Sequence, residues 1–544
     1  MSGTPTASSG PRPVRSLTAV ARRLAAAWWP QVAALAAACG VVATTIGGAI
    51  GVGDALGTGL RRLAVSRLGR IDAAVIAEDF FTPRLLDESS GDGPRLVPAI
   101  VMEVSVDVPG GAGGSRATLL ACDDPAALGF SPPPPPLDAE GVIVNEPLAA
   151  ASGVAVGGAI VLRIPRRSAV PADSPLGRRT AESASRRLQV RAVLPGTAAG
   201  LGQFSLRPAQ ATGPLVVASL STARDILRRD DAVNVVFAVG GGTAGGDAAT
   251  WLSSRLRPAL ADYGLSLAVP PAKPEAPSPR AARLTSRRLL LPSGVDDAAT
   301  AVLRPAGARP SLAFLANAIM PAASADAAKP ASIPYSTVLG IDETRLPVGD
   351  LVAADGRPLP VPRDDEILID RWTADDLAAQ GRPVDVGDRI RLTFFRPESV
   401  HGRVEESAAE FRIAGIAEMQ GAAVARDLVP DVEGITDEKS IADWDPPFPF
   451  DPARVRTSPP HDEDDRFWKL YGTTPKAFIS LTAARRLAGS RFGRSTAWHL
   501  PDLPAARLEE LRRELAAAVK PEDVGIRVVP LRRQAVEAAR GSTP

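Results

Sequence analysis

The sequence predicts an α+β protein in which one long apolar helix precedes two similar mixed domains. Three observations support this prediction: an uncharged stretch near the N-terminus, a series of strand and helix patterns that occurs twice in the same order, and a Pro-rich segment between the two series. The chain has 544 residues, which is enough for several domains with sizeable cores.

The uncharged stretch covers residues 24–53, which contain no Asp, Glu, Lys or Arg. A helix needs about 20 apolar residues to cross a bilayer, whereas the apolar part of a cleaved signal peptide has about 7–15. We therefore expect an uncleaved transmembrane helix. Trp28 and Trp29 lie at its N-terminal edge, where indole rings favour the headgroup layer, so we expect them to be membrane-interface anchors. Leucines at helical spacing predict that the helix continues as a stalk over residues 54–69.

The orientation of this helix does not follow from charge alone. Arginines flank the span on both sides, so the positive-inside rule gives a near tie. Long domains are translocated largely regardless of nearby charge. We therefore expect residues 1–23 to form a cytoplasmic tail and the long remainder of the chain to lie outside the cytoplasm.

An internal duplication follows from patterns that occur in the same order in both halves of the chain. Residues 142–146 and 156–162 resemble residues 366–370 and 386–392: in each pair a strand leads through a short helix and a Gly-containing turn to a second strand. Later, both halves contain a strand that ends at a Ser helix cap, over residues 216–224 and 478–485. The predicted domains are copy 1 at 70–269, a Pro-rich linker at 270–282, copy 2 at 283–531 and a C-terminal segment at 532–544.

Each copy has βαβ-like ends and a strand-rich middle. Copy 1 is expected to close with a strand over 265–269, and copy 2 with a strand over 526–529. Two βαβ halves around a β-rich insertion indicate a split ferredoxin-like unit that carries an inserted small β domain.

Copy 2 is longer mainly through an insert at 424–475, which is acidic and rich in aromatic residues. A long loop with large apolar side chains is expected to have a role of its own. One interpretation is a contact loop for a partner or substrate; the alternative is that it packs back on its own domain. The candidate contact residues are Trp444, Phe448, Phe450, Phe467 and Trp468.

Patterns of catalytic, cofactor-binding or metal-binding residues are not found. No Lys follows a Gly, so the phosphate-binding Gly-Lys dipeptide is absent, and so is a Gly-x-Ser-x-Gly nucleophile motif. Residues 461–465 (HDEDD) look most like a metal site, but we expect a solvated acidic loop because the spacing of a calcium loop is missing. With 62 basic and 61 acidic residues, the chain also lacks the positive charge expected of a nucleic-acid binder. We expect a protein that is not an enzyme.

Several short segments resemble one family of membrane proteins. Residues 53–57 (GDALG) and 68–72 (LGRID), directly after the apolar stretch, resemble the start of MacB/FtsX-type ABC transporter permeases. Further segments in the same order are similar to that family, at 142–156, 164–166, 173–177, 204–208, 434–437, 443–450 and 474–478.

The resemblance implies a non-enzymatic permease component in the bacterial inner membrane, with MacB-like periplasmic domains. It also implies a separate ABC ATPase subunit, further permease helices, and lipid, lipoprotein, peptide or drug as possible substrates. In that family three more helices follow the periplasmic domain, but no second apolar run of about 18 residues occurs here. A truncated or split permease is therefore expected. The alternatives are a single-pass anchored binding or scaffold protein and an anchored extracytoplasmic enzyme.

Overall fold

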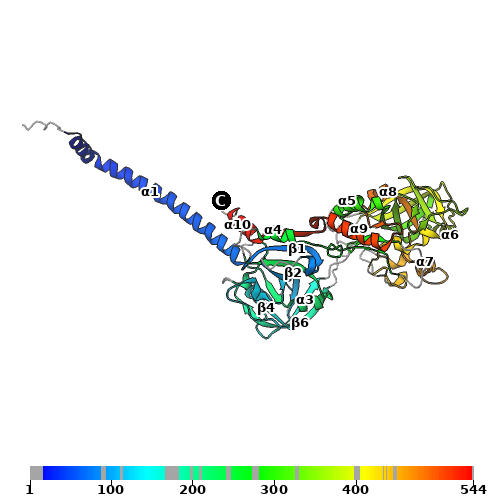
Figure 1. The fold of residues 1–544 in the computed structure, drawn as a ribbon, viewed down its shortest axis with the longest axis horizontal. Coiled ribbons are helices and arrows are strands. Elements are labelled where there is room, and N and C mark those ends of the chain that lie inside the picture. The colour runs from blue at the N-terminus through cyan, green and yellow to red at the C-terminus, as the bar shows by residue number, and fades with distance from the viewer. Residues whose placement is uncertain are drawn as a thin grey trace, which may run out of the picture.

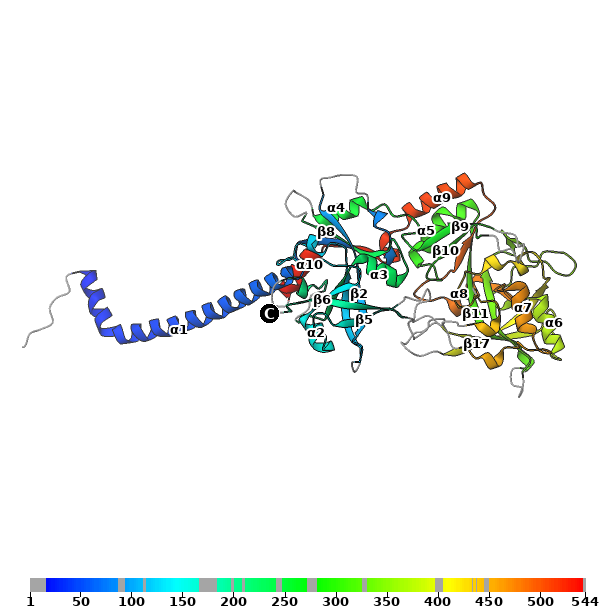
Figure 2. The same cartoon turned by 90° about the horizontal axis from the view of Figure 1, so that it is seen from below.

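The structure is a computed structural model that describes residues 16–86, 93–110, 114–165, 183–196, 200–207, 211–240, 247–271, 281–324, 330–396, 405–432, 434–436, 438–444 and 450–541. The predicted segment 173–177 and Phe448 lie outside these ranges. A long helix leads into a body of two units, with unit 1 beside the helix and unit 2 at the far end (Figures 1 and 2).

The first element is helix α1 (Leu17–Ser66), which contains the predicted span and all but the last three residues of the predicted stalk. The Ser16 side chain caps its start by accepting a hydrogen bond from the Ala19 N–H. It is the one helix among the described residues that is long and apolar enough to cross a membrane. Pro30 lies inside it, where a proline removes a backbone hydrogen bond, and the ribbon bends sharply near its N-terminal end (Figure 2). The prediction of one N-terminal apolar helix is confirmed.

Unit 1 consists of residues 70–256 together with 526–541. Its sheet has the strand order β20-β1-β8-β2-β3-β7-β4-β6-β5, and β2 also pairs with β5, so the strands from β2 to β5 close into a barrel. The strands are β1 (Ile71–Phe81), β2 (Arg95–Asp107), β3 (Ser115–Ala121), β4 (Gly141–Asn145), β5 (Ala159–Pro165), β6 (Ser183–Leu194), β7 (Leu215–Ala218), β8 (Val233–Val239) and β20 (Ile526–Val529). The helices are α2 (Glu146–Ser152), α3 (Leu220–Leu227), α4 (Ala248–Arg255) and α10 (Leu531–Gly541).

Unit 2 consists of residues 265–519. Its sheet has the order β9-β10-β19-β11-β16-β17-β15-β18-β12, and β12 pairs back with β11 to close a second barrel. The strands are β9 (Leu265–Ala268), β10 (Arg283–Ser286), β11 (Arg309–Pro321), β12 (Ile333–Ile341), β15 (Glu366–Asp370), β16 (Arg389–Phe395), β17 (Glu406–Ala417), β18 (Ala477–Ser480) and β19 (Ala497–His499), with a small ribbon of β13 (Arg345–Leu346) and β14 (Gly349–Asp350). The helices are α5 (Ser293–Val302), α6 (Arg371–Ala379), α7 (Glu463–Tyr471), α8 (Leu481–Ala488) and α9 (Ala505–Ala518).

Short 3-10 helices complete the connections. They are η1 (Pro83–Leu85), η2 (Pro125–Leu128), η3 (Leu201–Gln203), η4 (Arg304–Ala306), η5 (Ala322–Ser324), η6 (Gly421–Val424), η7 (Arg426–Leu428), η8 (Ile441–Asp443), η9 (Pro452–Arg454) and η10 (Pro521–Val524).

The two units are built in the same way. Matching each strand of unit 1 with its counterpart in unit 2 gives one strand order around both barrels. Ser219 and Ser480 cap the equivalent helices α3 and α8, as their sequence patterns predict. The predicted duplication is therefore confirmed at the level of two similar sheet units.

The predicted closing strands, however, lie in the opposite units. Strand β9 pairs antiparallel with β10 of unit 2, and strand β20 pairs antiparallel with β1 of unit 1. Assigning each to its own copy was wrong, because an alternating pattern predicts a strand and its faces but not the sheet edge that it joins. Unit 2 is thus inserted into unit 1 between α4 and β20. Residues 270–282 connect two neighbouring strands of one sheet; of these, 272–280 lie outside the described residues.

One of the hydrophobic clusters extends across both units. Buried residues of β1, such as Val75, belong to the same apolar cluster as Leu284 and Trp498 of unit 2. At the junction the Tyr263 hydroxyl donates to the Val519 carbonyl (3.2 Å), so the two crossing points lie side by side. Domain motion is expected across small polar interfaces, whereas a continuous apolar core favours one body.

Candidate functional site

In the part of the chain that the structure describes, nothing packs around the N-terminal part of α1. Trp28 and Trp29 are 59% and 66% exposed, and the most apolar window of the helix has no buried residue. An apolar helix surface of this length without a protein neighbour is suited to lipid. The role of the two tryptophans as interface anchors remains a prediction.

The other end of α1 enters the body at a tight turn. Gly69 has a φ of +56°, and a Cβ atom at this position would lie 2.7 Å from the Leu128 carbonyl oxygen. Any other residue would be strained there. This explains the glycine of the segment 68–72 and fixes the direction in which β1 leaves α1.

Helix α10 begins at the last residue predicted for copy 2 and continues into the predicted C-terminal segment, and it packs at the same turn against α1 and β1 (Figure 1). Leu531 is buried there, and the Arg532 side chain donates from Nε to Asp72 Oδ1 (2.7 Å) and from Nη2 to the Gly69 carbonyl (2.9 Å). The first and the last described helices therefore meet at one corner of unit 1. The sequence patterns did not predict this helix, because its contacts are with residues far away in the sequence, such as Asp72 and Asp247.

The insert packs largely onto itself and onto its own unit. Trp444, Phe467 and Trp468 are buried, and the rings of Trp444 and Trp468 lie 4.8 Å apart, edge to face. Phe450 is half-buried against Tyr335 of β12, with the ring centroids 4.9 Å apart. This packing favours the alternative in which the aromatic residues stabilise the insert. Contact with a partner remains a prediction for the outer surface of the insert.

The acidic run in the insert is not the solvated loop that was expected. Residues 463–465 open helix α7, and the Asp464 side chain is only 1% exposed. The Arg456 guanidinium is shared between Asp464 (Nη2–Oδ1 2.6 Å) and Asp376 of α6 (Nη2–Oδ2 2.6 Å, Nη1–Oδ1 2.7 Å). Burial alone would lower the pKa of Arg456, but the hydrogen bonds to both carboxylates outweigh it and raise the pKa. The expectation failed because this cation makes burial of the acids possible.

Two further buried charged residues, Lys476 and Asp370, lie within electrostatic reach of each other, and Lys476 lies within reach of this ion pair. The Lys476 ammonium is 4.3 Å from the centroid of the Phe467 ring, and burial lowers its pKa. Burial raises the pKa of Asp370 to about 6, although hydrogen bonding to Thr373 and the charge of Lys476 act in the other direction. Sequence reasoning did not find either residue; the only available signal was that Asp370 aligns with a neutral Asn145.

The remaining reactive side chains have structural surroundings. Burial raises the pKa of the Cys122 thiol to about 12, so it carries almost no nucleophilic thiolate. His499 is buried with its Nε2 2.8 Å from Ser311 Oγ, and burial lowers its pKa to about 3. Among the described residues, no group of three His, Cys, Asp or Glu side chains could hold a metal ion. The absence of an enzymatic activity remains an expectation.

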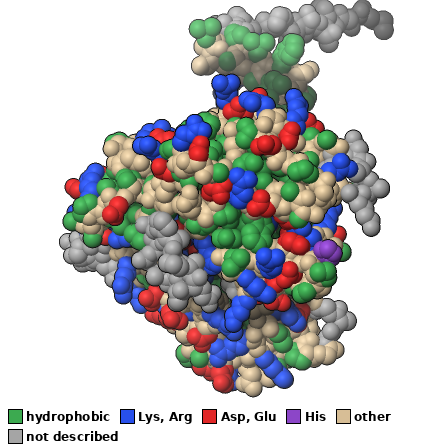
Figure 3. Space-filling view, turned by 90° about the vertical axis from the view of Figure 1, so that its right-hand side faces the viewer, with side chains coloured by type: hydrophobic (Ala, Val, Ile, Leu, Met, Phe, Trp, Pro, Cys, Tyr) green, Lys and Arg blue, Asp and Glu red, His purple; other side chains and the backbone are tan. Residues whose placement is uncertain are grey.

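The face of the body opposite α1 carries charged side chains of both signs, scattered over the surface around a small group of hydrophobic side chains (Figure 3). Such a surface does not favour one strongly charged ligand.

No protein-family model matches the chain, and no curated protein is similar to it. Solved structures to which parts of it are similar include the extracellular domain of the noncanonic ABC-type transporter YknZ from Gram-positive bacteria, at 10% identity over 34% of this chain and 93% of that chain, with a TM-score of 0.22. Another is the periplasmic region of MacB from Actinobacillus actinomycetemcomitans, at 9% identity over 34% of this chain and 81% of that chain, with a TM-score of 0.23. Parts of this chain are thus similar to extracytoplasmic regions of MacB and of an ABC-type transporter.

Proposed function

We propose that this chain is a non-enzymatic component of an ABC transporter permease of the MacB/FtsX type, anchored in the bacterial inner membrane by α1. The observation that carries the proposal is the continuity of α1, which passes from an apolar, exposed span directly into a folded body. The resemblance of residues 53–57 and 68–72 to the family supports it, because these residues form the passage from span to body. In this proposal residues 1–23 are cytoplasmic and the two units are periplasmic.

The proposed role of the body is to transmit ATP-driven movement or to bind substrate or a partner. A shared core between the units supports movement as one body, because displacement of α1 or α10 would be passed on to both. The ATPase and further membrane helices would be supplied by partners. We also propose that the outer part of each unit is a split ferredoxin-like βαβ unit, because β20-β1-β8-β2 and β9-β10-β19-β11 share one strand order.

The test is co-expression of the chain with an ATPase and with permease helices encoded beside its gene. The complex, in lipid nanodiscs, is expected to hydrolyse ATP faster than the ATPase alone, and the purified chain alone is expected to be inactive. Arg532→Ala should reduce the stimulation by disconnecting α10 from Asp72, whereas Arg533→Ala, which removes only an exposed pair with Asp247, should leave it unchanged.

Two results would contradict the proposal. Stimulation of the ATPase by this chain in the absence of other membrane helices would place the coupling surface within residues 1–23. A chain that associates with neither partner would favour the anchored scaffold protein instead.

A further inference from the structure

Strand β11 has a stretch whose backbone pairs with a strand on one side only, as far as the structure describes the chain. On one side β11 pairs with β12 over residues 312–319. On the other side it pairs with β19 over residues 309–311 and with β16 over residues 318–321. Among the described residues, no strand pairs with residues 312–317 on this second side. We call these residues, with the cavity beside them, the β11 seam.

The backbone of Leu315 faces the open side of this seam. Leu315 lies opposite Thr337, and the Thr337 carbonyl accepts a hydrogen bond from the N–H of Lys476, directly before the neighbouring strand β18 (2.9 Å). Because residues in an antiparallel pair alternate between facing and turning away from the partner strand, the Leu315 N–H and C=O also point away from β12. Two residues earlier, the Ala313 N–H points the same way and donates to Thr496 Oγ1 (2.9 Å).

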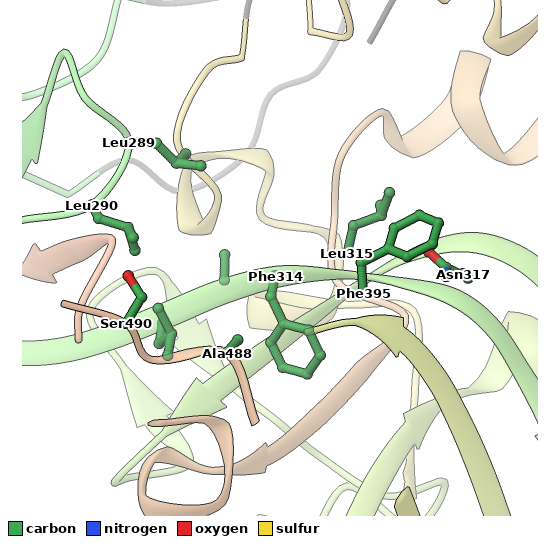
Figure 4. A pocket seen from close by; sticks show the side chains of 10 residues that line it. Leu289, Leu290, Phe314, Leu315, Asn317, Phe395, Ala488 and Ser490 are labelled. Atoms are coloured by element: carbon green, nitrogen blue, oxygen red, sulfur yellow. The ribbon is translucent and has the colours of Figure 1, made fainter. Parts of the chain in front are cut away.

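A cavity of about 40 Å³ lies in the seam, and its lining is mainly apolar (Figure 4). Leu289, Leu290, Phe314, Leu315 and Phe395 supply most of the lining, and Leu289 is held at a φ of +64°, which is rare for a large side chain. A buried water molecule needs several hydrogen-bond partners, and this apolar cavity offers few.

Asn317 supplies the polar group of the lining. Its side chain is 1% exposed, and its Nδ2 donates to Glu406 Oε1 (2.8 Å). Its Oδ1 has no hydrogen-bond partner among the described residues. A buried acceptor without a hydrogen bond lowers the stability of the folded chain. A ligand that donates a hydrogen bond to Asn317 Oδ1 would therefore be favoured at this site.

The equivalent stretch in unit 1 lies on β2 and differs from the β11 seam in its side chains. Asn234 and Val101 of unit 1 correspond to Thr496 and Ala313: the Val101 N–H donates to Asn234 Oδ1 (2.9 Å), and Asn234 Nδ2 donates to the Val101 carbonyl (2.8 Å). Glu103 stands in unit 1 where Leu315 stands in unit 2, opposite Thr118, which likewise bonds to the next strand. An exposed charge protects a strand edge from pairing with other chains. Unit 2 has an apolar side chain at this position.

We propose that the β11 seam binds an extended polypeptide segment of a partner protein. The segment pairs its backbone with Leu315, donates an N–H to Asn317 Oδ1, and places one short apolar side chain in the cavity. A peptide fits better than a drug-sized molecule, because pockets for the latter measure about 300–1,000 Å³. It fits better than a lipid chain, because alternating N–H and C=O groups are matched by another backbone. This inference does not depend on ATP coupling.

The test uses the full chain in lipid nanodiscs and three fluorescent heptapeptides that alternate Thr with Ala, Val or Leu. At least one peptide should bind saturably and slow the amide hydrogen exchange of residues 312–317. Methylation of its central backbone nitrogen should weaken binding at least tenfold, because the pairing N–H is lost. This comparison requires no protein variant.

Two variants and a control locate the site. Leu315→Glu, which copies unit 1, and Ala488→Phe, which fills the cavity from α8, should each weaken binding at least tenfold. Glu103→Leu at the equivalent place in unit 1 should leave the affinity unchanged. The proposal is overturned if none of the peptides binds at millimolar concentration or if protection falls elsewhere. It is also overturned if the nanodisc lipid alone protects residues 312–317 to the same extent.

Discussion

Units 1 and 2 begin the same short helix with different residues, and the difference shows what the shared fold requires. In unit 1 the buried Asn145 accepts from the Leu148 and Leu215 N–H groups and donates to the carbonyls of Gly202 and Gly213. All of its hydrogen-bonding groups are thus used. The fold needs a side-chain acceptor here, and in unit 1 a neutral amide also provides the two donors.

In unit 2 the equivalent residue is the acid Asp370. Its Oδ1 accepts from the Thr373 N–H (2.7 Å), but its Oδ2 has no partner among the described residues, and the buried Lys476 is the nearby cation. Asp370 therefore preserves the helix cap. In place of the two N–H donors of Asn145 it has a negative charge, which the nearby Lys476 compensates. The same position therefore tolerates an acid only where the surrounding unit supplies positive charge.

The largest effect on stability is expected when Asn145 of unit 1 is replaced by aspartate, the residue that unit 2 has at this position. Asn145→Asp puts a carboxylate against the carbonyls of Gly202 and Gly213, which both lose their donor. None of the described hydrogen-bond partners of Asn145 carries a positive charge comparable to that of Lys476. We expect unfolding to become easier by at least about 4 kcal/mol at pH 7, measured by urea denaturation. Asn145→Ser, which keeps the cap acceptor, should cost less; equal costs would contradict the charge argument.

The next largest loss of stability is expected when the insert of unit 2 loses its buried cation, Arg456. Arg456→Met leaves the buried carboxylates of Asp376 and Asp464 facing each other, and removing one partner of such a pair costs about 3–5 kcal/mol. The half-buried Arg507, which bonds to Glu510 and Glu514 on the solvent side of α9, is the control: Arg507→Met should cost less than about 1 kcal/mol. Similar losses in both variants would show that the Arg456 network contributes little to stability.

The third prediction tests the exchange of closing strands. Ile76 and Arg527 lie opposite each other in the β1–β20 pair, within the span of a disulfide bond. In a background without the two natural cysteines, Ile76→Cys with Arg527→Cys should form a cross-link on mild oxidation and stabilise the chain by about 2–4 kcal/mol. If each copy kept its own closing strand, position 527 would instead lie opposite Thr285. Cross-linking of Thr285→Cys with Arg527→Cys, detected by mass spectrometry of the peptides, would contradict the inserted arrangement.

Local patterns were sufficient to predict the elements and the duplication. The matches between 142–146 and 366–370 lie within single strands, and the caps at Ser219 and Ser480 act on residues three positions away. Such features depend on near neighbours in the sequence. The exchange of β9 and β20 depends instead on which sheet edge is free after folding, and no residue in either strand records that.

The candidate site was harder to predict for the same reason. The aromatic residues of the insert were recognised, but their burial depends on contacts with Tyr335 of β12, more than 100 positions away. The Arg456 ion pair joins residues 80 positions apart. The β11 seam exists because β19 and β16 pair with the two ends of β11 and, among the described residues, no strand pairs with the stretch between them on that side. Sequence spacing predicts neither kind of feature, since both arise from tertiary packing.

The smallest effect on stability is expected when Asp370 of unit 2 is replaced by asparagine, the residue that unit 1 has at this position. Asp370→Asn keeps the cap on α6 and removes a buried charge. The pKa of Asp370 is raised to about 6 in the folded chain from 3.8, so its favourable contribution is complete below pH 3.8 and is lost as the pH rises through 6. The variant should therefore nearly match the natural chain at pH 4 and exceed it by about 2–3 kcal/mol at pH 7, in urea denaturation at several pH values. Lys476 is present in both proteins, so its titration largely cancels in the difference. If the stability difference between the variant and the natural chain is the same at pH 4 and pH 7, Lys476 keeps Asp370 ionised over this range. The charge of Asp370 would then be compensated in unit 2 as completely as the hydrogen-bonding groups of Asn145 are satisfied in unit 1.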